Sequence, residues 1–397
     1  MINKEKIQAL NQKFKPDIIR YRQHLHAHPE LSFEEKKTSQ YIQKILDHHG
    51  IKYESGWANT GIVALIGHGK KVVALRADID ALPIKETNKT PYISQNEGVM
   101  HACGHDVHTA SLLGAAIILK ELENDLPITA KLIFQPGEEK IPGGASILIN
   151  EGVLKKPHVD MIIGQHVHPE MEAGKIGICP GPFMASADEL HITVIGKGGH
   201  AAMPEQCIDT IMISAEIITA LHQITGRYAP KEPTLLTIGK INSTGGATNI
   251  IPDEVKMEGT FRAFNEEWRS RAHMLIKKIA EGIATAHGAK CNMTILKGYP
   301  YLENNMELTL EIKQRIAEYM GTDNTVNLPK RMTSEDFAFY SHEIPACFYR
   351  LGTGNVSRGI TSGVHTSTFD VDEEIFNHSS GLMVWIAIST FFEKNEP

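Results

Sequence analysis

The stretch VVALRADID, residues 72–80, decides the fold class of the chain. Its first six residues, Val72–Ala77, are apolar except for Arg76 and have the length and β-branched content of a buried strand. Two aspartates, Asp78 and Asp80, complete the stretch. Further strand-like runs lie at 61–66, 131–135 and 161–164. Helix-like runs alternate with them, at 109–122 and 144–151. This alternation predicts an α/β domain with a largely parallel sheet, whose functional site lies beyond the carboxyl ends of its strands.

Acids and histidines follow these predicted strands. Glu138 and Glu139 come after the run at 131–135, and His166 comes after the run at 161–164. Two adjacent glutamates suit metal-assisted hydrolysis, because one can bind a metal ion while the other acts as a general base towards metal-bound water. The pair alone would be explained equally well as solvated turn residues. His168, two residues after His166, competes with it for the same role, and spacing leaves that choice open.

A second group of candidate metal ligands lies in HACGHDVHT, residues 101–109. Cys103 and His105 offer a thiolate and an imidazole, and Gly104 lets the backbone turn tightly enough for both to face one ion. The apolar residues that follow predict a loop that opens a helix. We expect His101 and His108 to support the site rather than to bind metal.

Length, charge and cysteine content exclude several classes of protein. A chain of 397 residues is long for one core, so two domains are expected. A net charge of −7, without a long basic run, disfavours nucleic acid and acidic membrane surfaces as partners. No apolar run is long enough for a membrane span, and the five cysteines are scattered without a CxxC pair. These features predict a cytoplasmic protein in a reducing compartment.

The pattern changes near residue 187. Elements in the order β-α-β-β-α-β are expected at 189–195, 209–224, 234–242, 255–262, 266–287 and 289–295. This is the order of a ferredoxin-like α+β unit. We therefore predict a discontinuous first domain, residues 1–186 and 299–397, with an inserted domain at 187–298. Other helices are expected at 16–27, 33–49, 306–320 and 376–392, and the histidines at the end of the first of them, His24, His26 and His28, are interpreted as solvated.

The motifs occur in an order that resembles a known family. They are HPELSFEE, RADIDALPI, MHACGHDVHT, FQPGEE, GKGGHAAMP, TNIIPDEVKMEGTFRAF, MTSEDFAFY and VHTSTFDVDE. Together they resemble the hippurate hydrolase and auxin-conjugate amidohydrolase branch of the aminoacylase and carboxypeptidase G-like metallopeptidases. The resemblance extends from about Arg22 to Glu374.

The resemblance implies a zinc-peptidase-like catalytic domain with an inserted lid and dimerisation domain. It implies two divalent metal ions per subunit (Zn, Mn, Co or Ni), with Cys103 as the bridge, held by Cys103, His105, Glu139, His166 and His365. Glu138 is then the general acid/base, and Asp80 supports the ligands from behind. His200 corresponds to a histidine that polarises the scissile carbonyl, often across a dimer interface. Asn249 and Arg262 correspond to positions that bind the substrate carboxylate; a surface salt bridge is the alternative for Arg262.

The implied activity is hydrolysis of an amide bond other than the usual peptide bonds of proteins. The substrate would be a small N-acyl-L-amino acid, N-acetyl or N-benzoyl, cleaved to a carboxylate and a free amino acid by a homodimer or a dimer of dimers. An aminopeptidase or dipeptidase and an N-acetyl-diaminopimelate deacetylase are alternatives within the class. A metal-free enzyme with Cys103 as nucleophile and His105 as base, and a binding module without activity, are alternatives from other classes. The turn Ser334–Asp336 could line the pocket or cap a helix.

Overall fold

The computed structural model describes residues 2–390, and the chain divides into two compact units. The second unit consists of Pro182–Leu302 and Lys330–Glu335, and the first contains the rest of the described chain. Each unit has its own cluster of buried apolar side chains. Each can therefore be described as a separate folding unit.

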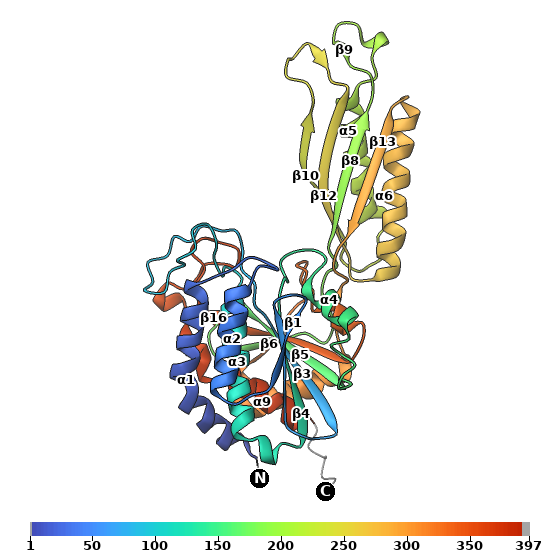
Figure 1. The fold of residues 1–397 in the computed structure, drawn as a ribbon. Helices are drawn as coiled ribbons and strands as arrows, with labels where there is room; N and C mark the ends of the chain where they lie inside the picture. Colours follow the sequence, from blue (N-terminus) through green and yellow to red (C-terminus); the bar gives the residue numbers. More distant parts are fainter. Residues whose placement is uncertain (1, 391–397) are drawn as a thin grey trace. The chain divides into compact units, whose positions relative to one another are not determined.

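An eight-stranded mixed sheet forms the centre of the first unit (Figure 1). In order across the sheet, the strands are β1 (Tyr53–Trp57), β2 (Gly61–Ile66), β4 (Ile128–Gln135), β3 (Lys71–Asp78), β5 (Met161–Glu172), β16 (Ala346–Gly354), β6 (Ile176–Ile178) and β15 (Thr325–Asn327). The four central strands, β4, β3, β5 and β16, are parallel to one another, while β1, β2 and β6 pair antiparallel with their inner neighbours. The predicted largely parallel sheet is confirmed.

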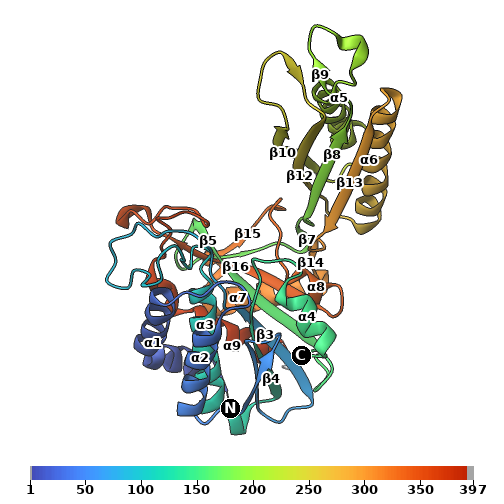
Figure 2. The same ribbon diagram turned by 45° about the horizontal axis from the view of Figure 1, so that its top comes forward.

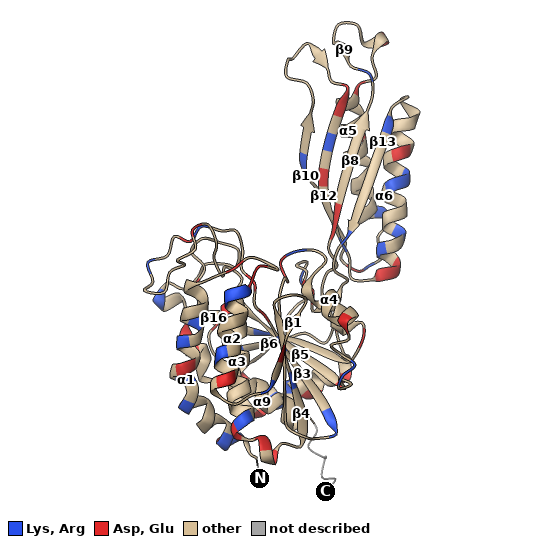
Figure 3. Cartoon of the chain, in the orientation of Figure 1, with Lys and Arg blue, Asp and Glu red and all other residues tan. Residues whose placement is uncertain are grey.

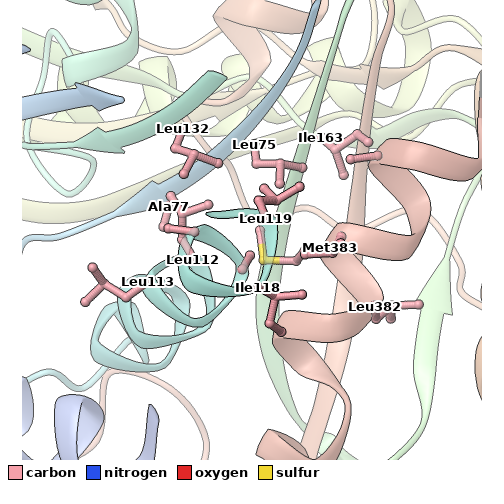
Figure 4. Close-up of a cluster of buried hydrophobic side chains, with 14 of the residues drawn as sticks. Leu75, Ala77, Leu112, Leu113, Ile118, Leu119, Leu132, Ile163, Leu382 and Met383 are labelled. Carbon is pink, nitrogen blue, oxygen red and sulfur yellow. The ribbon is translucent and has the colours of Figure 1, made fainter. Parts of the chain in front are cut away.

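Helices pack against this sheet, and two of them are buried along nearly their whole length. The helices of the unit are α1 (Lys4–Ala27), α2 (Lys36–His48), α3 (His105–Glu121), α4 (Gly144–Glu151), α7 (Met306–Met320), α8 (Ala338–Ser341) and α9 (Ser379–Ser389). Every residue of α9 is buried, and Figure 3 shows no charged residue along it, in contrast to α1. Figure 4 shows Leu119 of α3 and Met383 of α9 beside Leu75 of β3. Within residues 2–390, no helix combines the length and apolar character that crossing a bilayer requires.

Three sequence expectations differ from the structure. The first helix begins at Lys4 rather than near residue 16, because Asn3 caps it and its apolar face, which includes Ile7 and Phe14, is buried. Burial there outweighs the cost of Pro16 inside the helix. The strand β5 continues to Glu172, so His166 lies within it and not after it. The predicted last helix, 376–392, is observed as α9 but begins at Ser379, and residues 391 and 392 lie outside the described part of the chain.

A four-stranded antiparallel sheet in the order β10-β12-β8-β13 forms the second unit (Figure 2). Its elements are β8 (Asp188–Ile195), β9 (Gly199–His200), α5 (Thr210–Gln223), β10 (Leu235–Ser243), β11 (Ile250–Ile251), β12 (Glu254–Arg262), α6 (Glu266–Ala286) and β13 (Lys290–Lys297). Along β8 buried side chains alternate with more exposed ones, so the helices cover one face of the sheet. The predicted β-α-β-β-α-β order is confirmed. Two short strands, β7 (Gly181–Met184) and β14 (Leu302–Asn304), lie where the chain passes between the units.

Candidate metal centre

The loop before α3 presents Cys103 and His105 as buried neighbours. Gly104 between them caps the helix in the left-handed conformation, with φ 80°. A Cβ atom at this position would lie 2.6 Å from a methyl carbon of Val167, so only glycine fits here. The turn inferred from the sequence therefore has both a conformational and a steric reason.

The five predicted ligands form two groups that share Cys103. In each group the candidate ligand atoms lie within 4.8 Å of one another, and the groups are Cys103 with His105 and His166, and Cys103 with Glu139 and His365. The Cys103 sulfur lies 3.4 Å from Nε2 of His166 and 3.3 Å from Nε2 of His365. Thiolate, imidazole and carboxylate are ligands that first-row divalent ions accept. A sulfur common to both groups would allow Cys103 to bind two neighbouring ions.

The orientation of His105 fits a bound cation. Its Nδ1 donates to the backbone oxygen of Asp80 at 2.9 Å and lies 3.1 Å from that residue's Oδ1. Nδ1 therefore carries a proton, and Nε2 is the ring nitrogen that faces the cluster. This buried Nε2 has no hydrogen-bond partner within the described chain, which is costly unless an ion binds it. The imidazole of His166 is held in the same way, because its Nδ1 contacts the backbone oxygen of Val167 at 2.8 Å.

Two other histidines near the cluster have different partners. His108 uses both ring nitrogens, one with Asp78 Oδ1 at 2.5 Å and the other as the acceptor of the Val167 amide at 2.9 Å. It is thus occupied as a support, as the sequence indicated. His168 pairs with Glu170 at 2.8 Å and belongs to none of the ligand groups found in residues 2–390. The geometry favours His166 over His168 as the ligand.

The backbone that carries Glu138 and Glu139 is held by two buried acids. Asp80 Oδ2 accepts from the Glu139 amide at 3.0 Å and from Ser32 Oγ at 2.6 Å. Glu35 Oε1 accepts from the amide of Gly137 at 2.9 Å. Sequence reasoning included Asp80 but missed Ser32 and Glu35. Both residues lie in the motif HPELSFEE, and membership of this motif is the only sequence feature that points to them.

The electrostatics of the cluster call for a positive charge. Burial raises the pKa of Cys103 well above its usual value, and the neighbouring carboxylates raise it further. Burial alone would lower the pKa of His105, but Asp78, Asp80 and Glu139 outweigh it and raise that pKa to about 10. Reactive cysteines without metal lie in electropositive surroundings, so this environment disfavours the metal-free nucleophile alternative. A divalent cation would balance the acids and stabilise the thiolate.

Glu138 lies beside this cluster and is held by the turn at Asp336. The Asp336 amide donates to Glu138 Oε1 at 3.3 Å, and Glu138 is 6% exposed. The Asp336 carboxylate accepts from Arg76 Nη2 at 2.6 Å, and Arg76 Nη1 donates to Asp78 at 2.6 Å. The sequence left the role of the turn open; in the structure Asp336 is a buried ion-pair partner. Arg76 was missed, because its partners Gln135 and Asp336 lie on other segments of the chain, 59 and 260 residues away.

The interpretation of His26 as solvated is wrong. The side chain is buried, with Nδ1 2.8 Å from Asp106 Oδ2 and Nε2 3.2 Å from Glu86 Oε1. Both acids are at least 60 residues away in sequence, so the pattern around the helix end could not reveal them. His24 and His28 are partly buried and stack on one another, and His24 also stacks on Tyr41.

The predicted residues of the second unit lie at two separate places. His200 pairs with Ile250 in the β9–β11 ribbon, and the Ala201 amide donates to the backbone oxygen of Asn249 at 3.0 Å. His200 and Asn249 are thus neighbours, and both are exposed. Arg262 is the last residue of β12, whose nine residues put roughly 27 Å between it and the ribbon. One copy of the chain therefore does not bring Asn249 and Arg262 together.

Arg262 has a partly buried guanidinium that faces a pocket of the second unit. The open pocket has a volume of about 460 Å³ and is lined by Arg262, Arg331, Met332 and Thr333. Nη1 of Arg262 is buried and has no hydrogen-bond partner in residues 2–390, and burial lowers the pKa of the side chain. The surface salt bridge considered as an alternative is absent from the described residues. An unpaired guanidinium suits an anionic group such as a carboxylate.

Comparisons with known proteins agree with this geometry. The model of peptidase family M20/M25/M40 matches residues 74–383. An N-acyl-L-amino acid amidohydrolase of Geobacillus stearothermophilus is 45% identical over 301 residues, 75% of this chain and 80% of that protein. An N-acetyl-L-cysteine deacetylase of Bacillus subtilis is 39% identical over 90% of this chain and 84% of that protein. The crystal structure of Bacillus subtilis YXEP, a dinuclear metal binding peptidase from the M20 family, superposes with a TM-score of 0.82, at 34% identity over 96% of this chain and 99% of that one.

Proposed function

The chain belongs to peptidase family M20/M25/M40 as a metal-dependent amidohydrolase, and we propose that it hydrolyses N-acyl-L-amino acids to a carboxylate and a free amino acid. The acyl group would be a small one, such as acetyl or benzoyl. Two similar relatives carry names that specify N-acyl or N-acetyl amino acids as substrates, which supports this substrate class.

The observation that carries the proposal is the pair of ligand groups joined at Cys103, with Glu138 beside them. Two divalent ions held by Cys103, His105, Glu139, His166 and His365 would act as Lewis acids on the substrate carbonyl and on the attacking water. Glu138 would take the proton of that water and pass it to the leaving amine. The Asp336 amide donates to Oε1 of Glu138 and holds this carboxylate close to the candidate ligands His105 and Glu139.

We further propose that the second unit is a lid and dimerisation domain, and that His200 and Asn249 serve the site of a partner subunit. Both residues are exposed, and so are the apolar side chains next to them, including Met203 at 48% and Ile250 at 52%. An exposed apolar patch around polar residues of this kind suits contact with a second copy. Arg262 is the proposed partner of the substrate carboxylate.

A substrate panel on metal-restored protein tests the proposed function. The protein is stripped with a chelator and dialysed, and Mn, Co, Ni or Zn is then added back. We expect hydrolysis of N-acetyl and N-benzoyl amino acids to disappear and return, measured as release of free amino acid. Uncapped dipeptides and N-acetyl-diaminopimelate are included. Faster cleavage of either of these would replace the proposed substrate class.

A further inference from the structure

Arg22, near the end of α1, is a buried arginine with three carboxylate partners. Its Nε donates to Asp106 Oδ2 at 2.8 Å, and its Nη2 donates to Asp370 Oδ1 at 2.9 Å. Its Nη1 reaches Glu373 Oε1 at 3.3 Å. The guanidinium also lies over the ring of Tyr92, 4.6 Å from its centroid. The side chain is 0% exposed, so all of its charge is satisfied inside the protein.

These carboxylates belong to the two chain segments that carry candidate ligands at opposite ends of the sequence. Asp106 follows His105 directly in the first turn of α3, while Asp370 and Glu373 follow His365 by five and eight residues. The segments also touch through the backbone, because the His365 amide donates to the oxygen of Ala102 at 2.7 Å. Arg22 therefore makes a second connection between segments that are already joined next to the ligands.

His26, one turn after Arg22, extends the connection. It bridges Asp106 to Glu86, whose Oε1 also accepts from Asn88 Nδ2 at 3.0 Å. The same Asn88 nitrogen donates to the backbone oxygen of Phe369 at 2.8 Å. Through Glu86 and Asn88, His26 is thus connected by hydrogen bonds to the chain segment that follows His365.

His365 itself needs such restraint. It has φ 61°, a conformation that is rare for residues other than glycine and is stable only when the surroundings enforce it. Its side chain is 51% exposed, so packing alone holds it weakly. A ligand in this position depends on the segment that carries it, and Arg22 is a buried contact of that segment.

We propose that Arg22 is a positioning residue for the metal centre: it fixes the spacing of His105 and His365 by holding the carboxylates that follow each of them. The proposal rests on the ligand set proposed above. A lysine cannot replace the arginine, because one ammonium group cannot reach carboxylates in several directions as a planar guanidinium does.

Arg269 in the second unit provides a matched control. Its side chain is also 0% exposed and also pairs with acids, Asp188 at 2.8 Å and Glu266 at 3.0 Å. Neither acid belongs to a candidate ligand group among the residues that the structure describes. Removal of either arginine takes the guanidinium partner away from a buried carboxylate, Asp106 or Asp188, and should lower the Tm to a similar degree. Only removal of Arg22 should change metal binding.

The test is a Co²⁺ titration of the metal-stripped protein, followed by its absorption spectrum, for wild type, Arg22→Gln, Arg22→Lys and Arg269→Gln. We expect the Kd for Co²⁺ to rise about 10- to 100-fold in Arg22→Gln, with an altered spectrum and an unchanged circular dichroism spectrum. Arg22→Lys should raise the Kd for Co²⁺ by a smaller factor. If Arg22→Gln does not fold, the Kd of Arg22→Lys tests the proposal in its place. Arg269→Gln should stay within about twofold of wild type.

Wild-type Kd values and spectra in folded Arg22→Gln or Arg22→Lys, with only the Tm lowered, would overturn the proposal and leave Arg22 a purely structural residue. Equal losses of affinity in Arg22→Gln and Arg269→Gln would overturn it as well. Failure of the wild-type protein to bind Co²⁺ through a thiolate would instead overturn the proposed metal centre itself. The two failures are therefore distinguishable.

Discussion

The two units of this molecule hold their predicted functional residues in opposite ways. In the first unit, ligand candidates up to 262 residues apart in sequence come within hydrogen-bond distance, and all but His365 are mostly buried. In the second unit, His200, Asn249 and Arg262 come from a span of 63 residues, yet they lie at two separate places. Sequence proximity is thus a poor guide to which residues act together.

The difference follows from the direction of the strands. In the first unit β3, β4 and β5 run parallel, so the residues at and just after their carboxyl ends meet at one edge. In the second unit β12 runs antiparallel to both neighbours, and the predicted residues lie near its two ends, with His200 and Asn249 before its start and Arg262 as its last residue. A parallel sheet assembles a site within one chain. If His200 and Asn249 act at the site of a partner subunit, as proposed, the two ends of β12 would serve different sites.

The largest expected effect tests the first unit. Glu138→Gln should lower kcat about 10²- to 10⁴-fold, because the proton acceptor is lost while every proposed ligand remains. Metal content, measured by mass spectrometry, should be unchanged. Glu170→Gln is the control, since this exposed glutamate pairs only with His168 among the contacts described above. A Glu138→Gln protein with full metal and near wild-type activity would rule out Glu138 as the base.

The next prediction tests the second unit by mixing two inactive variants. Glu138→Gln and His200→Ala should each be nearly inactive alone. If His200 serves the partner's site, an equal mixture that exchanges subunits should recover roughly a quarter of wild-type activity, because half of the dimers then carry one complete site out of two. The measurement is the rate before and after subunit exchange.

No recovery in a mixture whose exchange has been demonstrated would contradict the proposed sharing of sites. It would place His200 in the service of its own chain, or remove it from the reaction if His200→Ala alone proves fully active. Either result would mean that His200 does not act at the site of a partner subunit, and the two units would no longer differ in this respect.

The smallest expected effect concerns the buried acids that distinguish the first unit. Burial, with a contribution from Asp80, raises the pKa of Glu35 from its usual value near 4.5 to about 7. The folded protein therefore retains a proton that the unfolded chain loses. The free energy of unfolding should fall by on the order of 3 kcal/mol as the pH rises from about 4.5 to about 7, and remain lower above that range.

Glu35→Gln should remove this dependence, because the amide oxygen can still accept from the amides of Phe33 and Gly137 while the amide nitrogen faces Thr60. Urea unfolding at pH 4.5 and pH 8 measures the difference. The exposed neighbour Glu34, changed to glutamine, is the control and should keep the wild-type slope. An equal pH dependence of the free energy of unfolding in all three proteins would show that Glu35 is ionised at both pH values and does not cause this dependence.

Local patterns were enough to predict the main elements of the second unit and many of those in the first, but not the strands β1, β6, β15 and β16. The alternation along β8 and the apolar runs of β3 and α7 follow from side-chain periodicity, and the structure has α7 at the predicted residues. The start of α1 was missed, since Pro16 looked like a first-turn proline while burial of Ile7 extends the helix to Lys4.

Long-range partners could not be predicted. The ligand candidates were found because Cys, His and Glu residues gather in motifs, and their mutual distances required coordinates. His26 looked solvated because Asp106 and Glu86 are remote in sequence. Arg76 and Glu35 carried no signal beyond membership of a motif, and Arg22 carried none, because an arginine or a glutamate is usually a surface residue.

The most direct test of the shared thiolate is the metal content of Cys103→Ala, with Cys207→Ala as the control in the second unit. Both proteins and wild type are loaded with Zn²⁺, passed through gel filtration and analysed by mass spectrometry. We predict about two ions per chain in wild type and Cys207→Ala, and less than one in Cys103→Ala, because both ligand groups lose the same sulfur. One ion per wild-type chain, or two ions retained by Cys103→Ala, would contradict the dinuclear centre.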